Sequence, residues 1–180
     1  MCVQIIVDSS TNVREKYREK IQFVPLTVRF GDKEYLDGVE ISKHQFYEML
    51  VESDVLPTTS QATPAAFADC FEAIASAGDS AVVITLSSKL SGTYQSAVLA
   101  AEDYPNIYVV DSQSVAIGTG VLAQYAVELA QQGMGAEEIA QGLTQQREKV
   151  CVVALLDTLE YLKKGGRISK TVAFAGGMLN

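Results

Sequence analysis

The stretch that decides the fold is A-V-V-I-T-L-S-S-K-L-S-G-T-Y-Q-S-A, residues 81–97. Its first four residues are apolar, which is typical of a strand buried on both faces. Its second half leads into a helical pattern over residues 92–103. A strand followed directly by a helix is the repeating unit of parallel α/β folds. Between the two lies a high density of hydroxyl groups, on Thr85, Ser87, Ser88, Ser91, Thr93, Tyr94 and Ser96.

The same alternation of strand and helix extends along the whole chain. It predicts an α/β fold, with a parallel-sheet N-terminal domain carrying helices on both faces and the start of a truncated second α/β domain. The predicted strands are 3–7, 81–86, 107–110 and 151–156, with an edge strand at 24–30 that contains Pro25 and a hairpin partner at 33–36. The predicted helices are a charged one ending at Lys20 and those at 42–53, 63–77, 92–103, 115–132, 136–149 and 157–164.

The C-terminal part of the sequence predicts a domain boundary. The strand expected at 151–156 has no later strand to pair with, and the apolar residues after Arg167 have no later element to cover them. We therefore predict an N-terminal α/β domain over residues 1–149 and the beginning of an incomplete C-terminal domain over residues 150–180.

Composition excludes several classes of function. The 180 residues carry 22 acidic and 14 basic side chains, a net charge of −8, and no basic stripe, so binding to nucleic acid is not expected. No apolar run approaches the ~20 residues of a membrane span, and residues 1–8 read as a strand rather than as a signal peptide. The three cysteines are predicted to be reduced, buried thiols of a cytoplasmic protein. The single histidine, His44, is expected to be exposed at a helix start, and neither a metal nor a cofactor is expected.

Four polar loops are predicted to gather at one edge of the sheet, because ligands of parallel sheets bind beyond the carboxyl ends of the strands. These loops are 8–12, 57–63, 86–92 and 111–114. Near Gly92 the unpaired N–H groups of a helix start, together with the hydroxyls of Ser91 and Thr93, can hold a phosphate or a carboxylate. The alternative is structural: Ser91 caps the helix and the other hydroxyls satisfy a loop. The same two interpretations apply to Thr58, Thr59 and Ser60.

Familiar catalytic patterns do not fit the sequence. Asp8 lacks the second carboxylate two residues later that a phosphatase nucleophile needs, because Ser10 stands there. The chain has no G-x-S-x-G elbow, no G-x-G-x-x-G motif and no Walker pattern, and His44 is poorly placed for a Ser-His-Asp triad.

Taken together, the motifs resemble those of the DegV family of bacterial fatty-acid-binding proteins. They occur in family order and cover nearly the whole chain. The matching segments are I-I-V-D-S-S-T-N (5–12), V-P-L-T-V-R-F-G-D-K-E-Y-L-D-G-V-E-I (24–41), L-P-T-T-S-Q-A-T-P (56–64), L-S-S-K-L-S-G-T-Y-Q-S-A (86–97), I-Y-V-V-D-S (107–112) and D-T-L-E-Y-L-K-K-G-G-R-I-S-K (157–170).

The resemblance implies a carrier that holds a long-chain fatty acid between two domains. By this resemblance the fatty-acid carboxylate meets Thr59 and Ser91, with Ser60, Gly92 and Thr93 close by. The acid is then presented to a partner fatty-acid kinase of the dihydroxyacetone-kinase type, which makes the acyl phosphate. Arg167 would lie near the opening and face the partner, although a cation at a helix C-terminus is an equally good structural explanation. Family members are longer, and their C-terminal part supplies much of the tunnel.

Two other functions stay open at this point. The same anion-binding loops would suit an enzyme acting on a phosphorylated or carboxylated metabolite, which would turn over substrate and hold no lipid. Alternatively, the chain is a fragment that binds no ligand. Our expectation is a lipid carrier that is not an enzyme.

Overall fold

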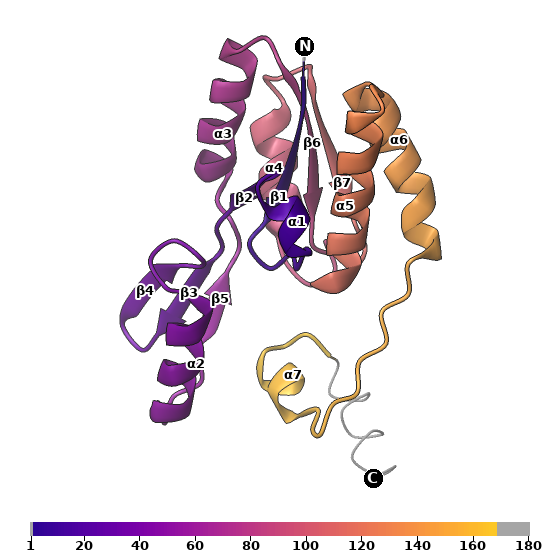
Figure 1. The fold of residues 1–180 in the computed structure, drawn as a ribbon. Coiled ribbons are helices and arrows are strands. Elements are labelled where there is room, and N and C mark those ends of the chain that lie inside the picture. Colours follow the sequence, from indigo (N-terminus) through magenta and orange to yellow (C-terminus); the bar gives the residue numbers. More distant parts are fainter. Residues whose placement is uncertain (1, 169–180) are drawn as a thin grey trace.

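The computed structural model describes residues 2–168, and its centre is a parallel sheet of four strands. The strands are β1 (Val3–Asp8), β2 (Ile21–Val24), β6 (Ser80–Thr85) and β7 (Ile107–Asp111), in the order β2-β1-β6-β7 (Figure 1). Ile5 pairs with Ile21 on one side and with Val82 on the other. Every residue of β6 is buried, as its unbroken apolar run predicted.

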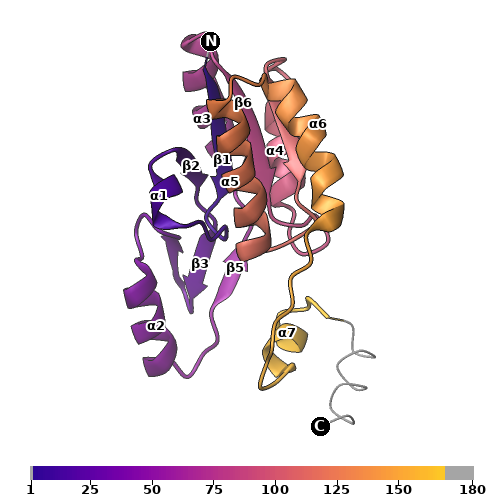
Figure 2. The same cartoon turned by 45° about the vertical axis from the view of Figure 1, so that its right-hand side comes forward.

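Helices cover both faces of this sheet, which confirms the predicted α/β architecture (Figure 2). Helices α3 (Pro64–Ser76) and α4 (Thr93–Ala101) pack on the face that carries Ile6 and Val83. On the other face, α5 (Ile117–Gln131) and α6 (Ala136–Gln146) pack on the side chains of alternate strand residues such as Val82. Successive strand residues point to opposite faces, so each β-strand feeds two apolar cores.

Two of the predicted helix starts are confirmed by their caps. Helix α2 (Lys43–Glu52) begins after Ser42 with a full capping box, in which the Ser42 hydroxyl accepts the Gln45 N–H. Helix α3 begins with Thr63 as N-cap and Pro64 at its first position.

A second, smaller sheet was not predicted. Strands β3 (Thr27–Phe30), β4 (Lys33–Leu36) and β5 (Thr58–Ser60) form an antiparallel sheet in the order β4-β3-β5, and Val28, Phe30 and Ile41 form a core with α2. The predicted hairpin of β3 and β4 is confirmed. The single edge strand expected at 24–30 is wrong, because the chain leaves the parallel sheet at Val24 and enters the small sheet only at Thr27. Pro25 lies at this break, where its missing N–H cannot weaken a ladder.

Two further predictions at the chain's ends are corrected. Helix α1 spans only Glu15–Arg18. The strand expected at 151–156 is wrong: in the described part of the chain this segment pairs with no strand, and its side chains include Val153 at 89% and Leu155 at 100% exposure. An apolar, β-branched composition favours a strand, but a strand also needs a neighbour.

The last described helix is α7 (Glu160–Lys164), which follows a 3-10 turn at Arg147–Lys149 and the extended segment. Asp157 does not cap it as predicted; the Thr158 hydroxyl accepts the Glu160 N–H instead (3.1 Å). The apolar tail lies, apart from Ile168, outside the described residues, and the division at residue 149 stays a prediction. No helix within residues 2–168 is long and apolar enough to cross a membrane.

Candidate functional site

The carboxyl edge of the parallel sheet brings together three of the four predicted polar loops. The loops follow β1, β6 and β7, and their main chains are joined by hydrogen bonds. The Leu86 N–H donates to Asp8 Oδ2 (2.7 Å), and the Ser88 hydroxyl donates to Asp111 Oδ2 (2.6 Å). The fourth segment was predicted as a loop, which is wrong, because Thr58–Ser60 is strand β5 of the small sheet.

Asp8 organises this edge from the inside. It is 0% exposed, and its carboxylate accepts the Leu86 N–H together with the Ser10 N–H (3.1 Å) and hydroxyl (2.5 Å). Burial raises the pKa of Asp8 above its ordinary value of 3.8, and the hydrogen bonds from Ser10 and Leu86 only partly oppose that rise. A carboxylate held in this way is a brace between loops, in agreement with the sequence argument against a phosphatase nucleophile.

Ser91 and Thr93 form a hydroxyl pair at the start of α4. Their side-chain oxygens lie 2.9 Å apart, and Ser91 Oγ also accepts the Thr93 N–H (3.3 Å). Thr93 is 0% exposed, whereas Ser91 and Gly92 are half-buried. The predicted alternative, in which Ser91 is the N-cap, is wrong, because the N-cap is Gly92, which has no side chain to cap with. Ser91 stands one residue earlier, and its hydroxyl accepts the N–H of Thr93, the first residue of the helix.

The segment after β5 packs directly on this helix start. The Ala62 N–H donates to Thr93 Oγ1 (3.3 Å), and Gln61 Nε2 donates to Ser96 Oγ (2.8 Å). Gln61 lies so close to Gly92 that a Cβ there would stand 2.0 Å from Gln61 Oε1. Gly92→Ala would have to displace the end of the flexible Gln61 side chain. Segments 58–62 and 91–96 are therefore packed in contact and form one unit. Gln61 was not among the predicted site residues, although it belongs to the quoted T-S-Q motif.

A groove of about 600 Å³ opens beside this unit, between loop 9–12 and helix α2; we call it the α2 groove. Thr59 lines it, whereas Ser91, Gly92 and Thr93 are not among its described lining residues. Ser60 is exposed and pairs with Thr27 in the small sheet. Ala116 also lines the groove with a φ of +50°, a conformation that costs a non-glycine residue energy and that often marks functional loops.

Among the described residues, Arg167 makes no hydrogen bond to the hydroxyl pair. It is exposed and follows the C-terminus of α7, where its Nη1 donates to the Gly165 carbonyl (2.6 Å). This geometry is that of a cation at a helix C-terminus, one of the two roles that the sequence allowed. Its partner-facing role stays a prediction.

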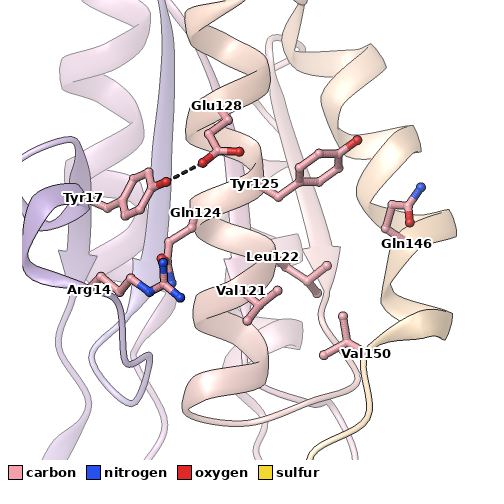
Figure 3. Close-up of a pocket in the computed structure, with 9 residues that line it drawn as sticks. All are labelled: Arg14, Tyr17, Val121, Leu122, Gln124, Tyr125, Glu128, Gln146 and Val150. Carbon is pink, nitrogen blue, oxygen red and sulfur yellow. Dashed lines mark hydrogen bonds between the residues drawn. The ribbon is translucent and has the colours of Figure 1, made fainter.

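A second pocket lies on the outer side of α5 and contains none of the predicted site residues (Figure 3). Tyr17 points across it and its hydroxyl donates to Glu128, and Arg14 and Gln124 also line it (Figure 3). Val121, Leu122 and Val150 provide its apolar lining. Its polar groups come from scattered elements, and the hydroxyl loops contribute no residue to its described lining.

The cysteines and the histidine have the following surroundings. Cys70 is buried, and burial raises the pKa of its thiol to about 11. Cys2 and Cys151 are exposed, so the prediction of buried thiols is wrong for those two. His44 is exposed near the start of α2 and lies 3.2 Å from Glu48. Within residues 2–168 no group of three or more His, Cys, Asp or Glu side chains is placed to hold a metal ion.

Comparison with known proteins identifies similar chains. The family model described as "Uncharacterised protein, DegV family" matches residues 2–180. A DegV domain-containing protein of Caldanaerobacter subterraneus is 38% identical over 182 residues, which are 99% of this chain and 65% of that protein. The chain therefore spans about 65% of the length of such curated relatives.

Solved structures of similar fold carry fatty-acid descriptions. One is described as showing fatty-acid binding of a DegV family protein from Thermus thermophilus; it has a TM-score of 0.84 and 33% identity over 100% of this chain and 65% of its own. Another is a stearic acid-binding protein from Eubacterium ventriosum, with a TM-score of 0.79 and 32% identity over 95% of this chain and 61% of its own.

Proposed function

The chain belongs to the DegV family, and from that premise we propose that it binds a long-chain fatty acid by its carboxylate and acts as a carrier, not as an enzyme. Structures of family members are described as fatty-acid-binding proteins. The chain spans about 65% of the length of such a structure, so the presence of an acyl tunnel is proposed here together with the binding itself. We also propose that residues from 150 onward begin a second domain that would close over the acid, and that the protein acts in the cytoplasm.

One observation carries the proposal: the packing of segment 58–62 on the start of α4. The bonds from Ala62 to Thr93 and from Gln61 to Ser96 hold two hydroxyl-rich segments together, although they are about 30 residues apart in sequence. The proposed carboxylate ligands are Thr59, Ser60, Ser91, Gly92 and Thr93, all of which belong to these two segments. The partial positive charge of the helix start adds to their attraction for an anion.

The hydroxyl pair has a spare proton. Thr93 Oγ1 accepts the Ala62 N–H, and its own proton can be donated to Ser91 Oγ, 2.9 Å away. Ser91 Oγ then accepts from Thr93 twice, through the hydroxyl and the main-chain N–H, and fills both of its acceptor positions. The Ser91 proton is left to donate outward, and Ser91 is only half-buried. A carboxylate oxygen is the acceptor that this arrangement fits.

A neutral cradle suits a carboxylate that must still react. A buried Arg or Lys would bind the anion more tightly but would withdraw charge from the attacking oxygen. In the proposed reaction a partner kinase of the dihydroxyacetone-kinase type supplies ATP. A carboxylate oxygen forms a bond to the γ-phosphorus, and ADP leaves with the electron pair of the broken P–O bond. Arg167 is proposed to face that partner.

The test compares matched hydroxyl deletions in the 180-residue chain. Thr59→Val removes a hydroxyl that lines the groove, whereas Thr58→Val removes its neighbour in the same strand. Ser91→Ala is matched by Ser88→Ala in the same loop. We expect Thr59→Val and Ser91→Ala to lower palmitate affinity by roughly tenfold, and both controls to stay within about twofold. Equal affinity in all four variants would refute the proposed cradle; thermal unfolding of each variant checks that it is folded.

A further inference from the structure

The pocket on the outer side of α5, which we call the α5 pocket, holds two opposite charges that do not pair. Its volume is about 500 Å³, within the range of roughly 300–1,000 Å³ that is usual for small-molecule sites. Arg14 and Glu128 both line it. Within residues 2–168, neither of them forms an ion pair with the other or with any other residue. One hollow therefore presents a separate cation and a separate anion.

Glu128 is held in position by a buried partner. The Tyr17 side chain is buried, and its hydroxyl donates to Glu128 Oε1 (Figure 3). In the described part of the chain this is the one hydrogen bond to the Glu128 carboxylate, so Oε2 stays free to accept. One turn earlier in α5, Gln124 Nε2 donates to the Gly120 carbonyl (3.0 Å) and leaves the amide oxygen as a second acceptor. Side chains at positions i and i+4 are neighbours on a helix, and an ammonium group has three donors to offer them.

Arg14 brings the opposite charge from another element. It directly precedes α1, and Figure 3 shows its side chain extended toward α5. Its guanidinium carries five N–H donors in a planar fork, which matches the two oxygens of a carboxylate. The apolar lining consists of Val121, Leu122 and Val150, and Val121 is 53% exposed. An exposed aliphatic side chain beside two charges offers a surface that an apolar group of a ligand would cover.

We propose that the α5 pocket binds a free α-amino acid with an aliphatic side chain. Its carboxylate pairs with Arg14, and its ammonium group with Glu128 and Gln124. Its side chain covers Val121 and Val150. A ligand with both charges matches the pocket better than a simple anion or cation, because either of these leaves one charge of the protein without a partner. The pocket shares no lining residue with the proposed carboxylate cradle, so this proposal does not rest on fatty-acid binding.

Nuclear magnetic resonance titration of the 180-residue chain tests the site, with L-leucine as the probe. L-leucinamide keeps only the ammonium group and N-acetyl-L-leucine keeps only the carboxylate, so these two ligands also stand for the two ends of a peptide chain. We expect L-leucine to shift the amide signals of Gln124 and Tyr125 at concentrations up to about 10 mM, and each single-charge ligand to bind roughly tenfold more weakly. No shift with L-leucine, or equal affinity for either single-charge ligand, would overturn the proposal.

Two charge variants assign the role of each side chain. Glu128→Gln still accepts the Tyr17 hydroxyl, and it should weaken L-leucine roughly tenfold while N-acetyl-L-leucine stays within about twofold. Arg14→Met should weaken L-leucine equally but leave L-leucinamide within about twofold. Glu138→Gln and Lys33→Met remove exposed charges outside the pocket and should behave like the unmodified chain. Thermal unfolding checks that each variant is folded; folded variants that bind L-leucine as the unmodified chain does would overturn the site.

Discussion

Substituting Gly120 by alanine tests how the groove wall is held. Gly120 lies in α5 against the main chain of Asn12, and a Cβ there would stand 1.9 Å from the Asn12 carbonyl oxygen, where ordinary contacts begin at 3.4 Å. The obstacle is main chain, so no side-chain rotation relieves it. Loop 9–12 is also anchored to α5, because the Asn12 N–H donates to the Ala116 carbonyl (3.2 Å). Either the helix shifts or this bond breaks.

The magnitude follows from comparing this glycine with another. Overpacking typically costs about 1–3 kcal/mol, and replacing a mid-helix glycine by alanine returns about 1 kcal/mol of helix propensity. Gly142 in α6 has nothing within 4 Å of the position that a Cβ would take, so Gly142→Ala should gain propensity without the overlap. We expect Gly142→Ala to stabilise by about 0.5–1 kcal/mol. For Gly120→Ala the overlap is with main chain, so the overpacking cost takes the upper end of its range, about 3 kcal/mol; the propensity gain of about 1 kcal/mol then leaves a destabilisation of about 2 kcal/mol.

Urea unfolding followed by circular dichroism measures both variants against the unmodified chain. An unchanged denaturant slope ensures that the midpoints report stability. If Gly120→Ala proves as stable as Gly142→Ala, loop 9–12 does not rest on α5 as described, and the wall of the α2 groove is not held by this contact.

Three other predictions follow from single side chains. Burial raises the pKa of Asp8 above 3.8, so the contribution of Asp8 to stability is largest in acid and is lost as the pH rises through the raised pKa. The unfolding free energy of the unmodified chain, measured relative to that of Asp8→Asn, should therefore fall as the pH rises above 3.8. A difference between the two proteins that does not change with pH would contradict this. Thr93→Val leaves a main-chain N–H of the neighbouring segment without its acceptor and should cost about 1–3 kcal/mol in urea unfolding; a neutral effect would remove the link between the two hydroxyl segments. In timed thiol labelling, Cys2 should react in the folded protein while Cys70, with a pKa of about 11, reacts only on unfolding; early labelling of Cys70 would contradict its burial.

The parallel sheet was predictable because its information is local. Unbroken apolar runs such as 81–84 mark strands buried on both faces, and Ser42, Thr63 and Pro64 mark helix starts by their chemistry. The small sheet was not predictable in the same way. Strand β5 is three exposed polar residues, and it is a strand only because β3, far away in sequence, lies beside it.

In the candidate site, too, features set by local sequence were predictable and features set by packing were not. The prediction that polar loops gather beyond the carboxyl ends of the parallel strands is confirmed for the loops after β1, β6 and β7. The contact of Gln61 with Gly92 depends on how the small sheet sits against α4, which no periodicity encodes. The Thr11 hydroxyl, which has no hydrogen-bond partner within residues 2–168, is likewise a result of packing, since loop 8–12 offers several hydroxyls and the sequence does not tell which of them is bonded.

The central claim is that these loops hold a fatty acid, and mass spectrometry tests it most directly. The 180-residue protein, purified from bacteria, is weighed under native conditions before and after organic extraction. A stoichiometric mass lost on extraction and identified as a fatty acid is the predicted result, and that mass gives the acyl length. A protein that carries no fatty acid, and takes up none when palmitate is supplied, would contradict the claim.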